Sequence, residues 1–415
     1  MRPAVHLDEL PSALAWKSDM AARIAELGDT WEREDGGPDA AGLLAIEESQ
    51  VVPIGRDCLP VPRELDWVLD DAIEAFRTRP DADWEPSSWR MLEPLARGEA
   101  ARGRGLGGWQ LRMRAPVAAL REWWERRLRD RVPFQYLISS AHWHTYVLSV
   151  GPGVLIPRPE TEIFPLLVAE ALRRSPALAA APWADLGTGS GAIAVAAADV
   201  LRGSNPSAVV WAVDVSPAAL AYAQFNAQLV LGGSPDGAVA AASSSAGGAA
   251  TAADAAGGRC PHVRVVRGSW FDPLLAAGLR GRLGGLLSNP PYIPRCQMAG
   301  LQAEVGRHEP AGALDGGEGH GLDSLQELCS RAAEMLVPGG LIALETAGGE
   351  QADLVAELLR RSGPDPTGAL SQSGDAACDG REGAGCATSA FEAVEVLEDC
   401  YGVRRFVRAY RSGGA

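Results

Sequence analysis

The spacing of apolar residues changes along the chain, from a helical period to an alternation of strands and helices. Between Arg63 and Phe76, apolar side chains recur at steps of three and four residues, which places them on one face of an amphipathic helix. A second helical stretch begins at Pro116, a residue suited to a first turn. These patterns predict a small helical N-terminal domain over residues 1–132, whose helices pack against one another.

A different pattern covers residues 133–160. Aromatic and apolar side chains from Trp143 to Val150 form a strand-like stretch, and Gly151-Pro152-Gly153 follows as a turn. We expect a β-hairpin here, and we expect it to link the N-terminal domain to the rest of the chain.

Residues 161–415 form the predicted second domain, in which short apolar runs alternate with amphipathic stretches. This alternation is typical of an α/β fold, a mostly parallel sheet with crossover helices. Strands are predicted over Trp183–Leu186, Val209–Asp214, Val263–Arg267, Leu283–Asn289 and Leu341–Thr346. Helices are predicted over Ala192–Leu201, Pro217–Val230, Ser324–Leu336 and Gln351–Arg361. Phe391–Glu398 and Arg404–Arg411 follow as a closing antiparallel pair, which is common at the edge of such a sheet.

Two stretches interrupt this alternation. Residues 232–258 are almost entirely Ala, Gly and Ser, and residues 362–389 are rich in Gly, Ser and Asp. Neither has enough apolar surface to order itself by burial. We interpret both as insertions that loop outward, away from any functional site.

Composition and charge narrow the function classes. The chain has 415 residues, of which 47% are hydrophobic, so it can build a sizeable core. Its formal charge of -15 argues against broad, phosphate-driven binding of nucleic acid. The seven cysteines include no CxxC pair and the six histidines show no ligand spacing, so no metal site is expected. No apolar run reaches the roughly 18 residues of a membrane span, and the acidic N-terminal region shows no transit peptide.

The first candidate site is the run from Asp185 to Gly191, which reads as a strand, a glycine-rich turn and a helix start. Glycines let the backbone approach a nucleotide-like ligand, although such runs are often only turns. Asp214 ends the next predicted strand, where a carboxylate can accept hydrogen bonds from both ribose hydroxyls or can simply cap a helix. The turn reads GxGxG rather than GxGxxG, so NAD is disfavoured but both NAD and S-adenosylmethionine remain open here.

The second candidate site is Asn289-Pro290-Pro291-Tyr292, which follows a predicted strand at the edge of the sheet where ligands bind. The Asn289 side chain and the Pro290 carbonyl can accept both N–H bonds of an NH2 group, and Tyr292 can cover a planar substrate. An amide nitrogen is a poor nucleophile because its lone pair is shared with the carbonyl. Acceptors placed around it would localise that lone pair, so the motif predicts methylation of a planar, amide-like nitrogen.

With these motifs in place, the chain resembles the release-factor glutamine N5-methyltransferase family, most closely its plant and algal plastid-type members. The markers are Pro133 to Tyr136, Ile156-Pro157-Arg158-Pro159-Glu160-Thr161-Glu162, the DLGTGSGAIA segment, Gly268 to Phe271, Asn289 to Pro294 and Glu304 to Pro310. The run from Ile156 to Glu162 separates this family from the DNA and RNA methyltransferases that share the Asn-Pro-Pro-Tyr loop.

The resemblance implies a Rossmann-like class I methyltransferase domain, with a mostly parallel seven-stranded sheet and an antiparallel edge strand, preceded by a small domain that helps hold the release factor. The implied S-adenosylmethionine site consists of Gly187, Thr188, Gly189, Ser190, Gly191, Asp214, Trp270 and Asn289. The implied substrate site consists of Asn289, Pro290, Pro291 and Tyr292, with Asn289, Pro290 and Tyr292 as the catalytic set. Arg158 and Glu162 shape the substrate entrance or form a structural salt bridge, and Ser269 stands where many bacterial relatives have Asp.

The expected partner is a peptide chain release factor, and the protein is expected to be a monomer that methylates no nucleic acid. The resemblance suggests a chloroplast location, with the mitochondrion or cytoplasm as alternatives. The main rival is an adenine or cytosine methyltransferase acting on nucleic acid, because base amines present the same planar NH2. A non-catalytic S-adenosylmethionine-binding protein and an NAD-dependent oxidoreductase are more distant alternatives.

Overall fold

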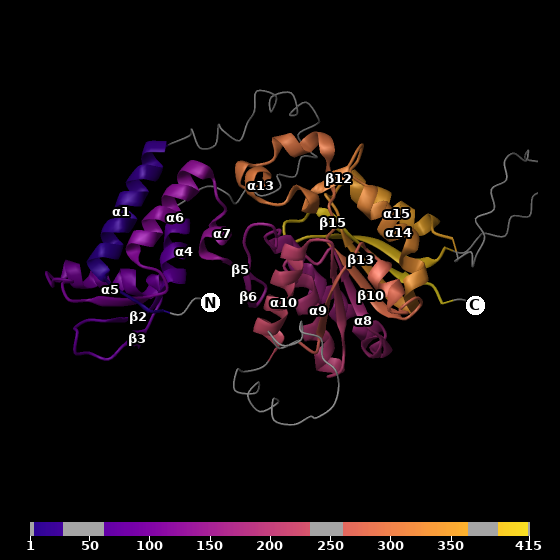
Figure 1. Cartoon of the computed structure of the whole chain (residues 1–415), viewed down its shortest axis with the longest axis horizontal. Helices are drawn as coiled ribbons and strands as arrows, with labels where there is room; N and C mark the ends of the chain where they lie inside the picture. Colours follow the sequence, from indigo (N-terminus) through magenta and orange to yellow (C-terminus); the bar gives the residue numbers. More distant parts are fainter. Residues whose placement is uncertain (1–3, 28–61, 233–259, 364–388, 414–415) are drawn as a thin grey trace, which may run out of the picture. The chain divides into compact units, whose positions relative to one another are not determined.

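The computed structural model describes residues 4–27, 62–232, 260–363 and 389–413 (Figure 1). These residues divide into two compact units. Unit 1 is Met1–Ser140 with Ala299–Glu309, and unit 2 is Ala141–Met298 with Pro310–Ala415. The two predicted insertions lie outside the described residues, except at their ends. In the described part of the chain, no helix combines the length and apolar character that a membrane crossing requires.

Unit 1 contains helices and a small antiparallel sheet. The helices are α1 (Leu10–Leu27), α4 (Pro62–Ala72), α5 (Trp89–Ala101), α6 (Val117–Asp130), α7 (Phe134–Ile138) and α13 (Ala303–His308). The strands β1 (His6–Glu9), β2 (Ile73–Arg77), β3 (Glu85–Pro86) and β4 (Gln110–Met113) pair in the order β1-β4-β2-β3. The helix predicted to start at Pro116 is confirmed as α6, with Pro116 at its N-cap.

The predicted helix over residues 63–76 is wrong in its last turn. It ends at Ala72, and Ile73 begins β2, which pairs with β4. Arg114 enforces this ending, because its backbone N–H donates to the Ala72 carbonyl at 2.7 Å and its guanidinium donates to Asp71 O at 2.7 Å. Apolar spacing alone predicts a continued helix here, since Phe76 would be buried in either structure.

Tryptophan side chains form much of the core of unit 1. Trp16, Trp89 and Trp124 are all buried, and the rings of Trp16 and Trp124 meet edge to face with centroids 6.5 Å apart. The indole N–H of Trp89 donates to Asp66 at 2.9 Å. These contacts hold α1, α4, α5 and α6 around one hydrophobic cluster. The prediction that the N-terminal helices pack against one another is confirmed for these four helices.

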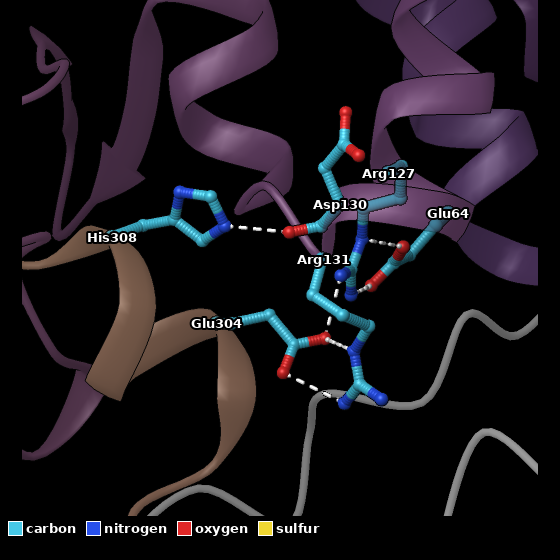
Figure 2. Close-up of polar contacts among 6 residues, drawn as sticks. All are labelled: Glu64, Arg127, Asp130, Arg131, Glu304 and His308. Atoms are coloured by element: carbon cyan, nitrogen blue, oxygen red, sulfur yellow. Dashed lines mark hydrogen bonds and ion pairs between the residues drawn. The ribbon is translucent and has the colours of Figure 1, made fainter. Parts of the chain in front are cut away.

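A buried cluster of four charges lies beside this core (Figure 2). Arg127 donates to both carboxylate oxygens of Glu64, at 3.1 and 3.2 Å, and to Glu304 at 2.6 Å. Arg131 donates to both oxygens of Glu304 at 2.8 Å. All four side chains are at most 5% exposed. The two positive and two negative charges therefore balance out of contact with water.

Glu304 belongs to the short helix α13 and ties that helix to the cluster through its bonds with Arg127 and Arg131. Burial pushes the pKa of Glu304 upward, but the hydrogen bond from Arg131 and the charge of Arg127 outweigh it and hold that pKa below its usual range. Among the described residues, Glu64 is hydrogen-bonded to Arg127, and burial leaves the pKa of Glu64 raised. His308 adds a hydrogen bond of 2.7 Å from its Nε2 to the carbonyl of Asp130 (Figure 2). Segment 299–309 is thus anchored within unit 1.

Unit 2 has the predicted α/β architecture. Its sheet consists of β7 (Trp183–Leu186), β8 (Val210–Asp214), β9 (Val263–Arg267), β10 (Leu283–Ser288), β13 (Leu336–Glu345), β14 (Phe391–Glu398) and β15 (Arg404–Arg411). The order is β14-β15-β13-β10-β7-β8-β9. The five strands from β13 to β9 in that order run parallel, and β15 runs antiparallel to both β13 and β14. The predicted seven-stranded sheet with an antiparallel closing pair is therefore confirmed.

Helices cover both faces of this sheet (Figure 1). One hydrophobic cluster includes residues of α8 (Phe164–Arg174), α9 (Ala192–Ser204) and α10 (Pro217–Leu231). The other includes residues of α12 (Asp272–Ala276), α14 (Asp323–Met335) and α15 (Glu350–Arg361). β7 and β10 are covered on both faces and are buried at every position, with apolar residues or glycine except at Asp185 and Ser288.

The predicted hairpin is present, but its turn lies elsewhere. β5 (Ser140–Trp143) and β6 (Tyr146–Ser149) form a two-stranded sheet, and the chain reverses at His144 and Thr145, where His144 has a φ of 52°. Phe134–Ile138 is a short helix rather than strand. The Gly151-Pro152-Gly153 turn comes after the hairpin, and Gly153 lines the cavity described below.

The charge cluster gives a stability prediction. Glu304→Gln leaves Arg127 and Arg131 buried without their shared carboxylate, so we expect unfolding to become easier by about 3–5 kcal/mol. Urea denaturation of the full chain measures this. Glu125→Gln is the matched control, because Glu125 pairs with Arg23 on the exposed surface of the same unit and should contribute at most about 1 kcal/mol. Equal losses in the two variants would contradict the prediction.

Candidate functional site

A cavity of about 370 Å³ opens at the carboxyl ends of the parallel strands of unit 2. The loops that follow β7, β8, β9 and β10 all contribute to its wall, as does the segment after the hairpin. Among its lining residues are Gly153, Val154, Leu155, Arg158, Thr161, Gly187, Thr188, Gly189, Ser190, Asp214, Ser269, Trp270, Asn289, Pro291, Pro310, Ala313 and Asp315. Ligands of open parallel sheets bind at this edge, so the topology itself indicates a binding site.

The glycine-rich turn needs its glycines for two different reasons. Gly187, Gly189 and Gly191 have φ values of 74°, 54° and 83°, a region that side chains with a Cβ disfavour. A Cβ on Gly187 would lie 3.5 Å from the Trp270 ring, inside the cavity wall. A Cβ on Gly191 would lie 2.9 Å from the Ala223 Cα. The 3.5 Å distance is an ordinary contact, so at Gly187 it is the positive φ that favours glycine, whereas Gly191 also lets α9 pack closely on α10 and is outside the lining.

Asp185 organises this turn from below. Its Oδ2 accepts hydrogen bonds from the Thr188 hydroxyl at 2.5 Å and from the Ala194 N–H at 3.0 Å. Its Oδ1 has no partner among the residues that the structure describes. Complete burial raises the pKa of Asp185 to about 7, although both hydrogen bonds oppose the rise. The sequence places Asp185 at the start of the motif but does not reveal this role.

Asp214 ties three loops together at the cavity wall. Its Oδ2 accepts from the Gly189 N–H at 2.9 Å, and its Oδ1 accepts from the Ser216 N–H at 2.8 Å. Its carbonyl accepts from the Gly268 N–H at 3.1 Å. Each carboxylate oxygen has further acceptor capacity beyond these bonds, so Asp214 is held rigidly while remaining able to accept donors from a ligand.

The Asn-Pro-Pro-Tyr loop divides between the cavity and the protein interior. Asn289 and Pro291 line the cavity, whereas Pro290 and Tyr292 are not part of the lining. The Tyr292 hydroxyl donates to Glu345 Oε1 at 3.1 Å, so this ring anchors the loop instead of standing in the lining. Burial and the nearby Glu345 charge raise the pKa of Tyr292.

Of the remaining predicted site residues, some line the cavity and one does not. Arg158 and Trp270 line the cavity, as does Ser269 at the position where many relatives carry Asp. Trp270 has a φ of 37°, an uncommon conformation for a tryptophan. Glu162 is outside the lining, and its carboxylate accepts from the backbone N–H of His144 at 2.8 Å, which fixes the hairpin turn.

Sequence reasoning missed several lining residues. Thr161 belongs to the Ile156–Glu162 run but was given no role, and Pro310 to Ala313 lie far along the chain from the other loops. Nothing in their spacing indicates that they share a wall. Among the described residues, no group of three or more His, Cys, Asp and Glu side chains is arranged to hold a metal ion.

No family model matches the chain, but curated relatives do. A release factor glutamine methyltransferase from Thermosynechococcus vestitus is 38% identical over 300 residues, covering 72% of this chain and 81% of the relative. A protein of the same name from Deinococcus radiodurans is 35% identical, covering 72% of this chain and 82% of the relative. The chain belongs to the release factor glutamine methyltransferase family. The resemblance found in its motifs is thereby confirmed, and a third relative, from Gloeobacter violaceus, is 42% identical over 60% of this chain and 72% of its own length.

The two glycine roles give a matched pair of variants in this family member. Gly191→Ala forces a Cβ into the α10 backbone at a positive φ, so we expect a loss of more than about 1 kcal/mol of stability. Gly203→Ala lies in the same helix, α9, with nothing within 4 Å of the added Cβ, and should stabilise the fold by up to about 1 kcal/mol. Denaturation midpoints of both variants check this, and the expected signs are opposite.

Proposed function

We propose that this protein transfers a methyl group from S-adenosylmethionine to the side-chain nitrogen of the glutamine in a Gly-Gly-Gln loop of a peptide chain release factor. One observation carries the proposal: Asn289 of the Asn-Pro-Pro-Tyr loop and the turn around Asp214 line the same cavity. An amide-binding loop and a nucleoside-binding turn thus share one space. Membership of the release factor glutamine methyltransferase family supports this substrate.

The residues of the cavity suit the methyl donor. Gly187 presents only backbone to the cavity, and Asp214 offers acceptors for ribose hydroxyls. Trp270 presents an apolar ring for the adenine, and Ser269 offers only a hydroxyl where an Asp would offer a carboxylate. When bound, S-adenosylmethionine supplies an electrophilic methyl group on a sulfonium. Gly187 to Ser190, Asp214 and Trp270 would hold it.

The contribution of the protein to the reaction is to bind and orient the amide. The Asn289 side chain, which lines the cavity, accepts one N–H bond of the substrate NH2 and positions its nitrogen. The Pro290 carbonyl is the second proposed acceptor, although Pro290 itself is outside the lining. Acceptors that favour a pyramidal nitrogen localise its lone pair and lower the barrier more than they stabilise the planar ground state. The proline pair fixes the backbone from which these acceptors project. We assign no side chain as a general base.

We further propose that unit 1, with the N-terminal domain assigned to residues 1–132, helps hold the release factor. Residues 133–160 link it to the methyltransferase domain at 161–415. Cyanobacterial relatives support a plastid location, and we propose a monomer. Light scattering on the purified protein tests the oligomeric state, and organelle fractionation tests the location. A stable dimer, or protein confined to another compartment, would overturn the respective proposal.

The activity itself is tested with purified protein, labelled S-adenosylmethionine and a release factor, with DNA and RNA offered separately. Peptide mass mapping then locates the added methyl group. Methyl on the Gly-Gly-Gln glutamine is the expected result. Label on nucleic acid alone would overturn the proposal and assign the same donor site to a base methyltransferase.

Removing the amide acceptor should separate catalysis from donor binding. We expect Asn289→Ala to abolish methyl transfer to the release factor while S-adenosylmethionine binding stays close to wild type, because the lost group faces the methyl acceptor. Initial rates and calorimetric titration of the donor measure the two quantities. Gln326→Ala, on the exposed face of α14, is the control that should change neither. Near-normal transfer by Asn289→Ala would refute the amide-binding mechanism.

Removing the proposed ribose acceptor, Asp214, should weaken binding of S-adenosylmethionine. We expect Asp214→Ala to weaken donor binding by roughly 1–3 kcal/mol, since it leaves buried polar groups unpaired. Asp272→Ala removes a largely exposed carboxylate from the first turn of α12 and should leave donor affinity unchanged. Calorimetric titration compares the two variants. An unchanged affinity in Asp214→Ala would remove the ribose assignment.

A further inference from the structure

Three residues from distant parts of unit 2 form a continuous chain of hydrogen bonds that ends at the site. Thr161 lies in η1 (Pro159–Ile163), Asn289 follows β10, and Glu345 is the last residue of β13. The Thr161 hydroxyl donates to Glu345 Oε2 at 2.8 Å, and Asn289 Nδ2 donates to the same hydroxyl at 3.3 Å. Thr161 is 3% exposed and Glu345 is 1% exposed. Water therefore has little access to compete for these bonds.

The chemistry of these groups gives the chain a direction. An ionised carboxylate only accepts, so the proton of the Thr161 hydroxyl must be committed to Glu345. With that proton committed, Thr161 can offer Asn289 only a lone pair. Asn289 must then turn its NH2 toward Thr161, and its Oδ1 is left for the cavity that the residue lines.

We propose that Thr161, held by Glu345, is a positioning residue that sets the orientation of the Asn289 carboxamide and so presents Oδ1 to the substrate NH2. The proposal rests on the proposed function, because only a substrate that donates hydrogen bonds distinguishes the two orientations. The opposite orientation would bring the Asn289 NH2 against the substrate NH2, two donors with no acceptor between them. The buried donors would then be unpaired, which is costly.

Glu345 also holds the other end of the Asn-Pro-Pro-Tyr loop. Its Oε1 accepts from the Tyr292 hydroxyl, so one carboxylate supports both Asn289 and Tyr292 through its two oxygens. The charged groups around Glu345 are Arg405, whose positive charge favours the ionised form, and Glu160, whose negative charge opposes it. Arg405 is itself paired with Asp399 at 2.6 Å.

The direction of the chain depends on the ionisation of Glu345. Burial raises the pKa of Glu345 to about 7, against the hydrogen bond from Thr161 and the charge of Arg405. A protonated Glu345 can donate to Thr161, which frees the Thr161 proton to point at Asn289 and favours the reversed amide. The ionised form is the active one, so the rate of transfer should fall as pH drops below about 7.

Substitutions at Thr161 test the proposal. Thr161→Val replaces the hydroxyl with a methyl group and keeps the branched side chain, whereas Thr161→Ser keeps the hydroxyl and loses the methyl group. We expect Thr161→Val to lower kcat by roughly 3- to 10-fold, the loss of about one hydrogen bond, with donor affinity unchanged, and Thr161→Ser to recover most of the rate. Binding of a Gly-Gly-Gln peptide to protein loaded with S-adenosylhomocysteine gives a second readout, which should weaken only in Thr161→Val.

Thr346→Val is the matched control, because Thr346 is buried beside Glu345 and its hydroxyl donates to Arg405 O at 2.9 Å without contacting Asn289 in the described residues. It should lose stability but keep kcat. The part of the decrease in rate below pH 7 that is due to Glu345 should be present in wild type and Thr161→Ser and lost from Thr161→Val and Glu345→Gln. Any decrease due to Asp185, whose pKa is also about 7, should be the same in all four proteins.

Wild-type methylation of the release factor glutamine establishes the proposed function independently of these variants. With that activity in hand, a wild-type kcat and peptide affinity in Thr161→Val would overturn the positioning role alone. Equal impairment of Thr161→Val and Thr161→Ser would also overturn it, because it would trace the effect to packing of the side chain. If wild type instead methylates a base amine, the proposed function fails alone, because a base NH2 also donates two hydrogen bonds. The role of Thr161 is then decided by kcat of Thr161→Val and Thr161→Ser on that substrate, and a wild-type kcat in Thr161→Val would overturn it.

Discussion

The burial of Glu304 between two guanidinium groups is the constraint on which the arrangement of this chain depends. It holds segment 299–309 in unit 1, although the residues before and after that segment belong to unit 2. The segment begins soon after the Asn-Pro-Pro-Tyr loop and ends where Pro310 enters the cavity wall. Breaking one partner away from a buried carboxylate costs several kcal/mol, about 3–5. The bonds from Arg127 and Arg131 to Glu304 therefore act together to hold α13.

Buried carboxylates recur in unit 2, with different partners and different consequences. Asp185 and Glu345 both lie at or near strand ends beneath the cavity, and both receive hydrogen bonds from hydroxyl groups instead of direct bonds from a guanidinium. Their pKa values rise to about 7, whereas that of Glu304 falls. Glu304 receives direct bonds from two guanidinium groups, which together outweigh its burial, whereas the single guanidinium on Glu64 does not lower the pKa of that carboxyl. Glu304 is thus a permanent anchor, while Asp185 and Glu345 titrate near neutral pH.

The sequence predicted the second unit far better than the first. The strands of unit 2 are short runs rich in apolar residues, and the predicted strands Trp183–Leu186 and Val263–Arg267 match β7 and β9 residue for residue. The predicted helix over 63–76 is wrong from Ile73 onward. Ile73 begins β2, which pairs with β4, and a pairing with residues this far along the chain leaves no sign in the local spacing of apolar residues. The motifs predicted that Asp214 and Asn289 belong to one site, but not that the Thr161 hydroxyl is hydrogen-bonded to Glu345. That link spans 184 residues of sequence, and no spacing rule reports it.

The loop that carries Asn289 is fixed from both sides, and this explains how a weak nucleophile can be served without a base. Thr161 and Glu345 hold the side chains of the loop, since Glu345 accepts from both Thr161 and Tyr292. Gln351 holds its backbone by donating to the Tyr292 carbonyl at 2.9 Å. A Cβ on Gly321 would lie 2.4 Å from that same carbonyl, so only glycine allows the neighbouring loop to pack this closely. The prolines contribute no N–H that could bend the loop toward another acceptor. Acceptors held this firmly need no reorganisation as charge develops, and such preorganised groups account for large rate enhancements. Under the proposed amide-binding mechanism, the rigidity of the loop would be its contribution to catalysis.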